Sequence, residues 1–152
     1  MSRAHESVIA FTAALMLGTL ANAADAQLSP CKLLTKEDVK AALGGEWQVW
    51  EDMGSEEVCV FQASPTTIVT LTLFTDPSGA ANILQVRKQL AGASAFPVTG
   101  LGPDAFRLSM SSANSIVFGK DQTVARLEVA TAVTSDTTLL ERLARTAYER
   151  MP

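Results

Sequence analysis

Apolar and polar residues alternate along several short stretches of the chain, which predicts β-strands with one buried face. The alternation is clearest in residues 67–75, where Val69, Leu71 and Leu73 fall on one side and threonines fall on the other. Five further stretches are equally short and are bounded by turn residues, namely 46–50, 57–63, 106–110, 115–119 and 123–131. Since tight turns such as residues 111–115 and 120–122 join most of these stretches, we expect mainly antiparallel pairing.

Two other stretches combine the helical spacing of apolar residues with signals for a helix start. Residues 33–45 have Thr35 as a natural N-cap, Asp38 at the third helical position and a stop at Gly44. The last stretch begins near residue 135 and carries an apolar stripe, formed by Leu139, Leu140, Leu143, Ala147 and Met151. Both stretches are predicted to be amphipathic helices.

A further helix is predicted in the middle of the chain. Asp76 and Pro77 provide a cap and a proline at the first helical position, and Gly92 ends the helix after Ala91. The expected buried face consists of Ile83, Val86 and Leu90. The segment between Gly92 and the next strand is rich in glycine and proline and is expected to be a loop.

The predicted order is helix, three strands, helix, three strands, helix. A chain of 152 residues has room for one domain rather than two. We therefore expect an α+β fold in which residues 27–152 form a single domain, with a mainly antiparallel twisted sheet and about three helices packed on one face. The two similar halves hint at a duplicated unit, although no residue-level repeat accompanies the hint.

Residues 1–26 are typical of a secretory signal peptide. Arg3 supplies a weakly positive start, residues 8–20 form an apolar run, and small residues follow at alternate positions. Cleavage after Ala23 or Ala26 fits this pattern. The apolar run is too short to span a hydrocarbon core of ~30 Å. We therefore expect a periplasmic or secreted protein that has no stable membrane span after cleavage.

Two alternatives to a cleaved leader are a buried core helix and an anchor that stays attached. A third alternative is a lipoprotein, because residues 28–31 (LSPC) superficially resemble a lipidation box. Pro30 stands where that box has a small residue, and Cys31 lies far beyond the end of the apolar run. Both departures argue against lipid attachment.

The chain has two cysteines, Cys31 and Cys59, so only one intramolecular pairing exists. Exported proteins meet oxidising conditions, which favour a disulfide. Closing this loop would contribute about 3–4 kcal/mol by restricting the unfolded chain. The competing interpretation is a pair of free thiols with a redox or metal role, but the chain has no C-x-x-C spacing.

The charge and the histidine content exclude several classes of function. A formal net charge of −4 argues against nucleic-acid binding, which requires a basic surface. The only histidine is His5, which lies in the predicted leader, so the mature chain has no histidine for a serine or cysteine nucleophile. We therefore expect no catalytic residues, no cofactor and no metal site. A small hydrolase is the least favoured function.

Residues 100–105 (GLGPDA) formally fit the G-x-G-x-x-A spacing of a dinucleotide-binding loop. That use requires a helix directly after the loop, whereas strand-like residues follow here, and Pro103 removes an amide donor. We interpret the segment as a tight turn that uses the conformational freedom of Gly100 and Gly102. These two glycines remain candidate contacts for a ligand or a partner.

Trp47 and Trp50 are the other candidate contacts, because an exposed aromatic residue can anchor a ligand or a partner. Core packing is the competing interpretation for both. The same region carries acidic residues with no lysine or arginine among them: Glu46, Glu51, Asp52, Glu56 and Glu57. We interpret these as a solvated acidic loop, with a weak cation site or a contact for a basic partner as alternatives.

Residues 30–44 (PCKLLTKEDVKAALG) resemble the start of small secreted bacterial proteins of unknown function, many of them actinobacterial lipoproteins with a P-C-x-L-L-T opening. Cys59-Val60-Phe61 and residues 100–106 are similar to later features of the same proteins. The resemblance implies a helix-plus-sheet domain with a bond between Cys31 and Cys59, and it implies no activity. This chain lacks a good lipid-attachment cysteine.

These observations favour an exported, non-catalytic domain that binds a small molecule or another protein of the cell envelope. The hypothesis rests on export, on a cross-linked domain and on the missing catalytic residues. A module that binds or inhibits a protein partner is the alternative function.

Overall fold

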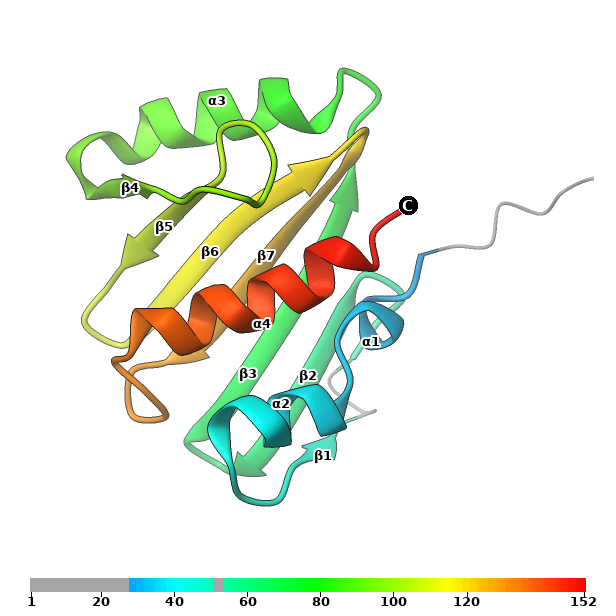
Figure 1. Cartoon of the computed structure of the whole chain (residues 1–152), viewed down its shortest axis with the longest axis vertical. Coiled ribbons are helices and arrows are strands. Elements are labelled where there is room, and N and C mark those ends of the chain that lie inside the picture. Colours follow the sequence, from blue (N-terminus) through cyan, green and yellow to red (C-terminus); the bar gives the residue numbers. More distant parts are fainter. Residues whose placement is uncertain (1–27, 51–53) are drawn as a thin grey trace, which may run out of the picture.

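The computed structural model describes residues 28–50 and 54–152, so the predicted leader lies outside the described residues. Within them, one open antiparallel sheet has the strand order β1-β2-β3-β7-β6-β5-β4 (Figure 1). The strands are β1 (Gln48–Val49), β2 (Val58–Ser64), β3 (Thr67–Thr75), β4 (Ala95–Pro97), β5 (Phe106–Ser109), β6 (Ala113–Lys120) and β7 (Thr123–Ala130). The helices are α1 (Pro30–Leu33), α2 (Lys36–Leu43), α3 (Ala80–Ala91) and α4 (Thr137–Glu149), with a 3₁₀ turn η2 (Gly92–Ser94). The predicted α+β class and antiparallel pairing are confirmed.

Helix α2 begins and ends where its sequence signals predict. The Thr35 side chain accepts a hydrogen bond from the backbone N–H of Asp38, and the Asp38 carboxylate accepts one from the backbone N–H of Thr35. This reciprocal pair satisfies two donors that the first turn of a helix leaves unpaired. Gly44 ends the helix with a φ of 72°, a conformation that glycine adopts without strain.

The centre of the sheet follows the predicted alternation. Strand β3 has its predicted bounds, and the side chains of Val69, Leu71 and Leu73 are buried. It pairs with β2 on one side and with β7 on the other, with Leu71 opposite both Cys59 and Leu127. The third and the last strands along the chain, β3 and β7, therefore meet at the middle of the sheet.

Strand β6 is longer than predicted. It starts at Ala113, inside the segment expected to be a turn, and joins β7 through the two-residue turn Asp121-Gln122. Every residue from Ala113 to Gly119 is buried, because helices cover both faces of this part of the sheet. A strand buried on both faces loses the alternation that marks its ends in the sequence.

Strand β4 lies in the segment that the glycine and proline content predicts to be a loop. It has three residues, pairs with β5 and forms one edge of the sheet. Pro97 is tolerated there because an edge strand has an unpaired side. The second half of the sheet therefore has four strands, and the hint of a duplicated helix-plus-three-strand unit is not supported.

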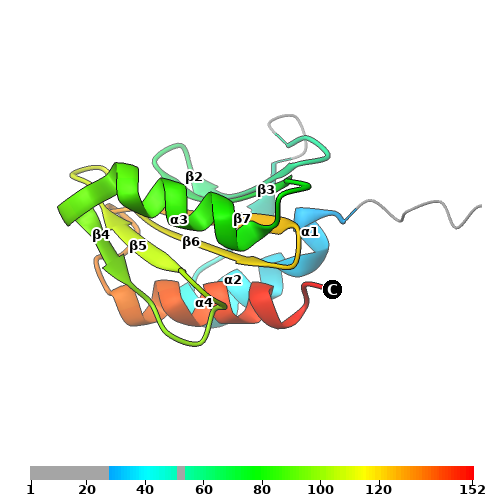
Figure 2. The ribbon, with the colours of Figure 1, turned by 90° about the horizontal axis from the view of Figure 1, so that it is seen from above.

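The helices lie on both faces of the sheet, which corrects the expectation of a single covered face (Figure 2). On one face, α1, α2 and α4 close the larger core, in which Phe61, Phe118 and Leu143 are buried. On the other face, α3 closes a second core over Phe106, Val117 and Val124. Helices are needed on both faces because β6 and β7 carry apolar residues on both sides of the sheet.

Helix α3 ends at Ala91 as predicted but begins three residues later than its sequence signals suggest. The Asp76 carboxylate accepts a hydrogen bond from the backbone N–H of Ser78 at 2.8 Å, so it forms a turn before the helix instead of capping it. Asp76 and Pro77 are therefore outside the helix. The start is Ala80, directly after Gly79, whose φ is 92°.

The buried face of α3 also differs from the prediction. Leu84 is fully buried, Ile83 is partly buried, and the side chains of Val86 and Leu90 are 53% and 83% exposed. The predicted set and the observed set both recur at three- and four-residue intervals, so spacing alone could not choose between them.

Cys31 in α1 and Cys59 in β2 form a disulfide, as predicted, and their Cα atoms lie 5.2 Å apart. The bond ties the start of the described chain to the sheet. A structural disulfide points to an oxidising compartment. Among the described residues, no helix has the length and the apolar character needed to cross a membrane.

Candidate functional site

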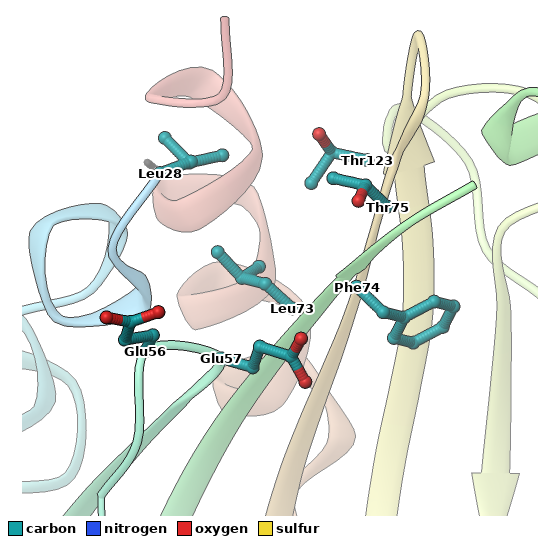
Figure 3. Close-up of a pocket in the computed structure, with 7 residues that line it drawn as sticks. All are labelled: Leu28, Glu56, Glu57, Leu73, Phe74, Thr75 and Thr123. Atoms are coloured by element: carbon teal, nitrogen blue, oxygen red, sulfur yellow. The ribbon is translucent and has the colours of Figure 1, made fainter. Parts of the chain in front are cut away.

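Strand β3 extends beyond the start of its neighbour β2. The first residue pair between them is Val58 opposite Thr72, and the carbonyl of Glu57 accepts a last hydrogen bond from the N–H of Leu73 at 2.7 Å. Beyond that point, Phe74 and Thr75 still pair with β7. The end of β3 borders a hollow of about 310 Å³ (Figure 3). We call this hollow the β3-end pocket.

The β3-end pocket combines apolar and polar walls. Apolar side chains come from Leu28, Leu73 and Phe74, carboxylates come from Glu56 and Glu57, and hydroxyls come from Thr75 and Thr123. In Figure 3 the two glutamates lie on one side of the hollow and the two threonines lie on the other. No lysine, arginine or histidine is among these lining residues. The pocket therefore offers negative charge, hydrogen-bond acceptors and a small hydrocarbon surface.

Two of the apolar walls are held in place by the cores on either side of the sheet. Leu73 is 4% exposed and belongs to the larger core, against which Leu28 packs. Phe74 packs against the second core, and the Arg87 guanidinium carbon lies 4.2 Å from the centroid of its ring. The pocket floor is therefore part of the rigid domain.

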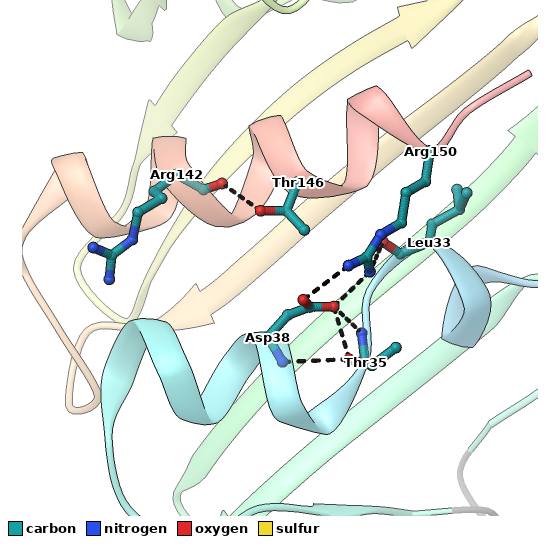
Figure 4. A network of polar contacts seen from close by, with 6 residues as sticks. All are labelled: Leu33, Thr35, Asp38, Arg142, Thr146 and Arg150. Carbon is teal, nitrogen blue, oxygen red and sulfur yellow. Dashed lines mark hydrogen bonds and ion pairs between the residues drawn. The ribbon is translucent and has the colours of Figure 1, made fainter.

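A polar network fixes the segment that leads from Leu28 into the domain (Figure 4). The guanidinium of Arg150, directly after α4, donates to both carboxylate oxygens of Asp38, with N···O distances of 2.5 and 2.9 Å, and also to the carbonyl of Leu33 at 3.1 Å. The pKa of Asp38 is lowered to about 2, chiefly by the hydrogen bond from Arg150 and also by the hydrogen bonds with Thr35, against the opposing effect of burial. An aspartate held ionised in this way is a poor general base, and its role is to join α2 to the end of α4.

The structure places Trp47 in the core. Its side chain is 7% exposed, and its indole N–H donates to the carbonyl of Gly44 at 2.7 Å. The competing interpretation of Trp47 as a core residue is therefore the one that the structure favours. Trp50 is partly buried, and its backbone N–H donates to the carbonyl of Val60 at 2.9 Å. It remains a candidate contact, but it is not among the residues that line the β3-end pocket.

Gly100 and Gly102 lie in a tight loop with φ values of 78° and 85°. Strand β5 follows the loop, so the helix that a dinucleotide site requires is missing at this position. A Cβ atom at residue 102 would lie 2.6 Å from the carbonyl oxygen of Gly119 and 3.3 Å from the hydroxyl of Tyr148. The second glycine therefore allows the loop to pack directly against β6 and α4, which is a structural role.

A second polar surface occupies the part of the sheet that α3 leaves uncovered. Arg126 and Glu128 form an ion pair on β7, opposite Thr72 and Thr70 of β3. The hydroxyl of Ser115 and the Nε atom of Arg126 are buried and have no hydrogen-bond partner among the described residues. The structure thus leaves hydrogen-bonding capacity here, although no hollow of the β3-end kind is lined by these residues.

Sequence reasoning identified one side of the β3-end pocket. Glu56 and Glu57 belong to the acidic stretch, one interpretation of which is a contact for a basic partner. Leu28, Thr75 and Thr123 carried no signal, because their proximity depends on how β3, β7 and the start of the chain meet. Within the described chain, no group of three or more histidine, cysteine, aspartate or glutamate residues could hold a metal ion.

Comparison with known proteins assigns no family. No family model and no curated protein matches the chain. A crystal structure of a protein from Bacteroides thetaiotaomicron VPI-5482 is distantly similar, with 10% sequence identity and a TM-score of 0.45. The match covers 65% of this chain and 40% of the Bacteroides chain. A similarity at this level carries no functional argument.

Proposed function

We propose that this chain is an exported, non-catalytic binding domain whose β3-end pocket receives a small molecule or a segment of another envelope protein. The observation that carries the proposal is the composition of the pocket, which combines two carboxylates with an apolar floor anchored in both cores. Its volume of about 310 Å³ is at the lower end of the range for ligand pockets.

The carboxylates decide which ligands fit. The Glu57 carboxylate repels anions and attracts an ammonium or guanidinium group, and the leucine side chains favour an attached hydrocarbon. A cationic group with an apolar neighbour is therefore the chemistry that this pocket suits, whether a small amine or a protein side chain carries it.

Three observations support export. They are the leader-like residues 1–26, the disulfide between Cys31 and Cys59, and the resemblance of residues 30–44 to small secreted bacterial proteins. In proposing a non-catalytic role, we take the Glu57 carboxylate to bind a cation rather than to act as an acid or base, since the described lining residues include no histidine, cysteine or lysine.

The test uses the exported protein purified from the periplasm without refolding. Native mass spectrometry detects a retained small molecule as added mass, and cross-linking in intact cells traps a protein neighbour. Either signal should weaken in Glu57→Gln and persist in Glu141→Gln, a variant that removes the same charge on α4, outside the pocket lining. An apo mass under varied growth conditions, together with no reproducible cross-linked neighbour, would refute the proposed function.

A further inference from the structure

The β3-end pocket has a feature that its side chains alone do not explain, namely an unpaired strand edge. The N–H of Asp76 donates to the carbonyl of Gln122 at 2.9 Å, so these two residues form a hydrogen-bonded pair between β3 and β7. The preceding pair, Thr75 opposite Thr123, is then of the non-hydrogen-bonded kind. The backbone N–H and C=O of Thr75 consequently point away from β7, toward the side on which β2 lies further along the sheet.

Strand β2 does not reach Thr75. Its first paired residue is Val58, and before it the backbone N–H of Glu57 donates to the Ser55 hydroxyl at 3.3 Å, which turns the chain away from β3. Among the described strands, none lies opposite Thr75 on this side. The residue is exposed, and within the described chain no strand pairs with its backbone on this side.

From this geometry we propose that the β3-end pocket binds an extended peptide segment of a partner protein, which pairs with Thr75 as a short continuation of the β2 position and places a lysine or arginine beside the carboxylate of Glu57. Backbone hydrogen bonds to a sheet edge supply affinity in this mode of recognition, and pockets for alternate side chains supply specificity. This inference rests on the proposed function and selects a peptide from the ligands that the function allows.

Charge and shape determine the chemistry of the partner segment. The Glu57 carboxylate lies on one side of the hollow and none of the described lining residues carries positive charge, so a basic side chain is favoured over an acidic one. The neighbouring peptide residue, whose side chain points to the opposite face, would contact Leu28 and Leu73 and should be apolar. Since only the end of β3 is free, the paired segment spans about two or three residues, and micromolar or weaker binding is expected.

The experiment measures binding of short fluorescent peptides to the intact exported protein by anisotropy. The probe is a capped peptide in which lysine alternates with valine. One control replaces the lysines with glutamates, and a second control carries N-methyl groups on the backbone amides that would pair with Thr75. N-methylation blocks strand pairing without altering the protein, so it should weaken binding about tenfold or more.

Glu57→Gln should weaken binding of the lysine peptide about two- to fivefold at low ionic strength, and Glu141→Gln should leave it unchanged. Equal binding of the N-methylated peptide would refute strand pairing, and equal binding of the glutamate peptide would refute the charge selection. Self-association that competes with the peptide would assign the edge to a second copy of this chain and overturn the proposal. If no peptide binds while a small molecule is retained in a Glu57-dependent way, this inference fails and the proposed function stands. If neither binds, both fail.

Discussion

The loop at Gly102 allows a quantitative test of how the domain is packed. The residue has a φ of 85°, and the position of its missing side chain is occupied by the backbone carbonyl of Gly119 and the hydroxyl of Tyr148. Gly102→Ala therefore introduces two separate penalties. One is the strain of a non-glycine residue at positive φ, and the other is a collision that only a shift of backbone can relieve.

Gly44→Ala separates these penalties, because Gly44 has a similar φ of 72° and no atom within 4 Å of the added Cβ. Strain alone should reduce the free energy of unfolding by about 1–3 kcal/mol at either position. The collision at 2.6 Å should reduce it by a further ~1–3 kcal/mol in Gly102→Ala only. The effect of an added methyl group on the unfolded chain is the same in both variants and cancels in their difference.

The assay is equilibrium unfolding in urea of the oxidised protein, followed by tryptophan fluorescence. With an m value of about 1–3 kcal/mol/M, the midpoint of Gly102→Ala should lie about 1 M below that of Gly44→Ala. Coincident midpoints would show that the loop does not press on β6 and α4, and the packing argument would then be wrong. A change in m value would indicate a more expanded state and would invalidate the comparison.

Three further predictions concern stability. The pKa of Asp38 is lowered to about 2, so its contribution to the free energy of unfolding should be fully present above the unfolded value near 3.8 and be lost as pH falls toward 2. In Asp38→Asn the free energy of unfolding should therefore fall less steeply with decreasing pH in this range, and at neutral pH it should be lower than in the native protein by about 1–2 kcal/mol. Replacing Cys31 and Cys59 together with serine should reduce the free energy of unfolding by about 3–4 kcal/mol in denaturant titrations, and reduction of the native protein should have a similar effect. Leu84→Ala should lower it by about 2–5 kcal/mol, whereas Val86→Ala should change it by about 0.5 kcal/mol or less; equal losses would contradict the observed orientation of α3.

Local patterns predicted much of the secondary structure. The Thr35–Asp38 capping pair, the alternation in β3 and the apolar stripe of α4 each depend on residues that are neighbours in the chain. The disulfide was predictable because two cysteines allow one pairing. These features depend on short-range geometry or on simple counting, so one sequence was sufficient to predict them.

Tertiary structure decided the features that depend on distant residues. The position of α3 depends on β6 and β7 being apolar on both sides of the sheet, and the spacing of Ile83, Leu84 and Val86 fits either orientation of the helix. The sequence of β6 does not alternate between apolar and polar residues, because both faces of the strand are buried.

The β3-end pocket likewise combines features that the sequence predicts with features that only the tertiary structure decides. The acidic character of Glu56 and Glu57 is visible in the sequence, whereas the accessible backbone of Thr75 exists only because β2 begins late and β7 takes the final place beside β3. Charge is a property of single residues and can be read in order along the chain. A free strand edge results from the register between strands, which is fixed only when segments far apart in sequence pack together.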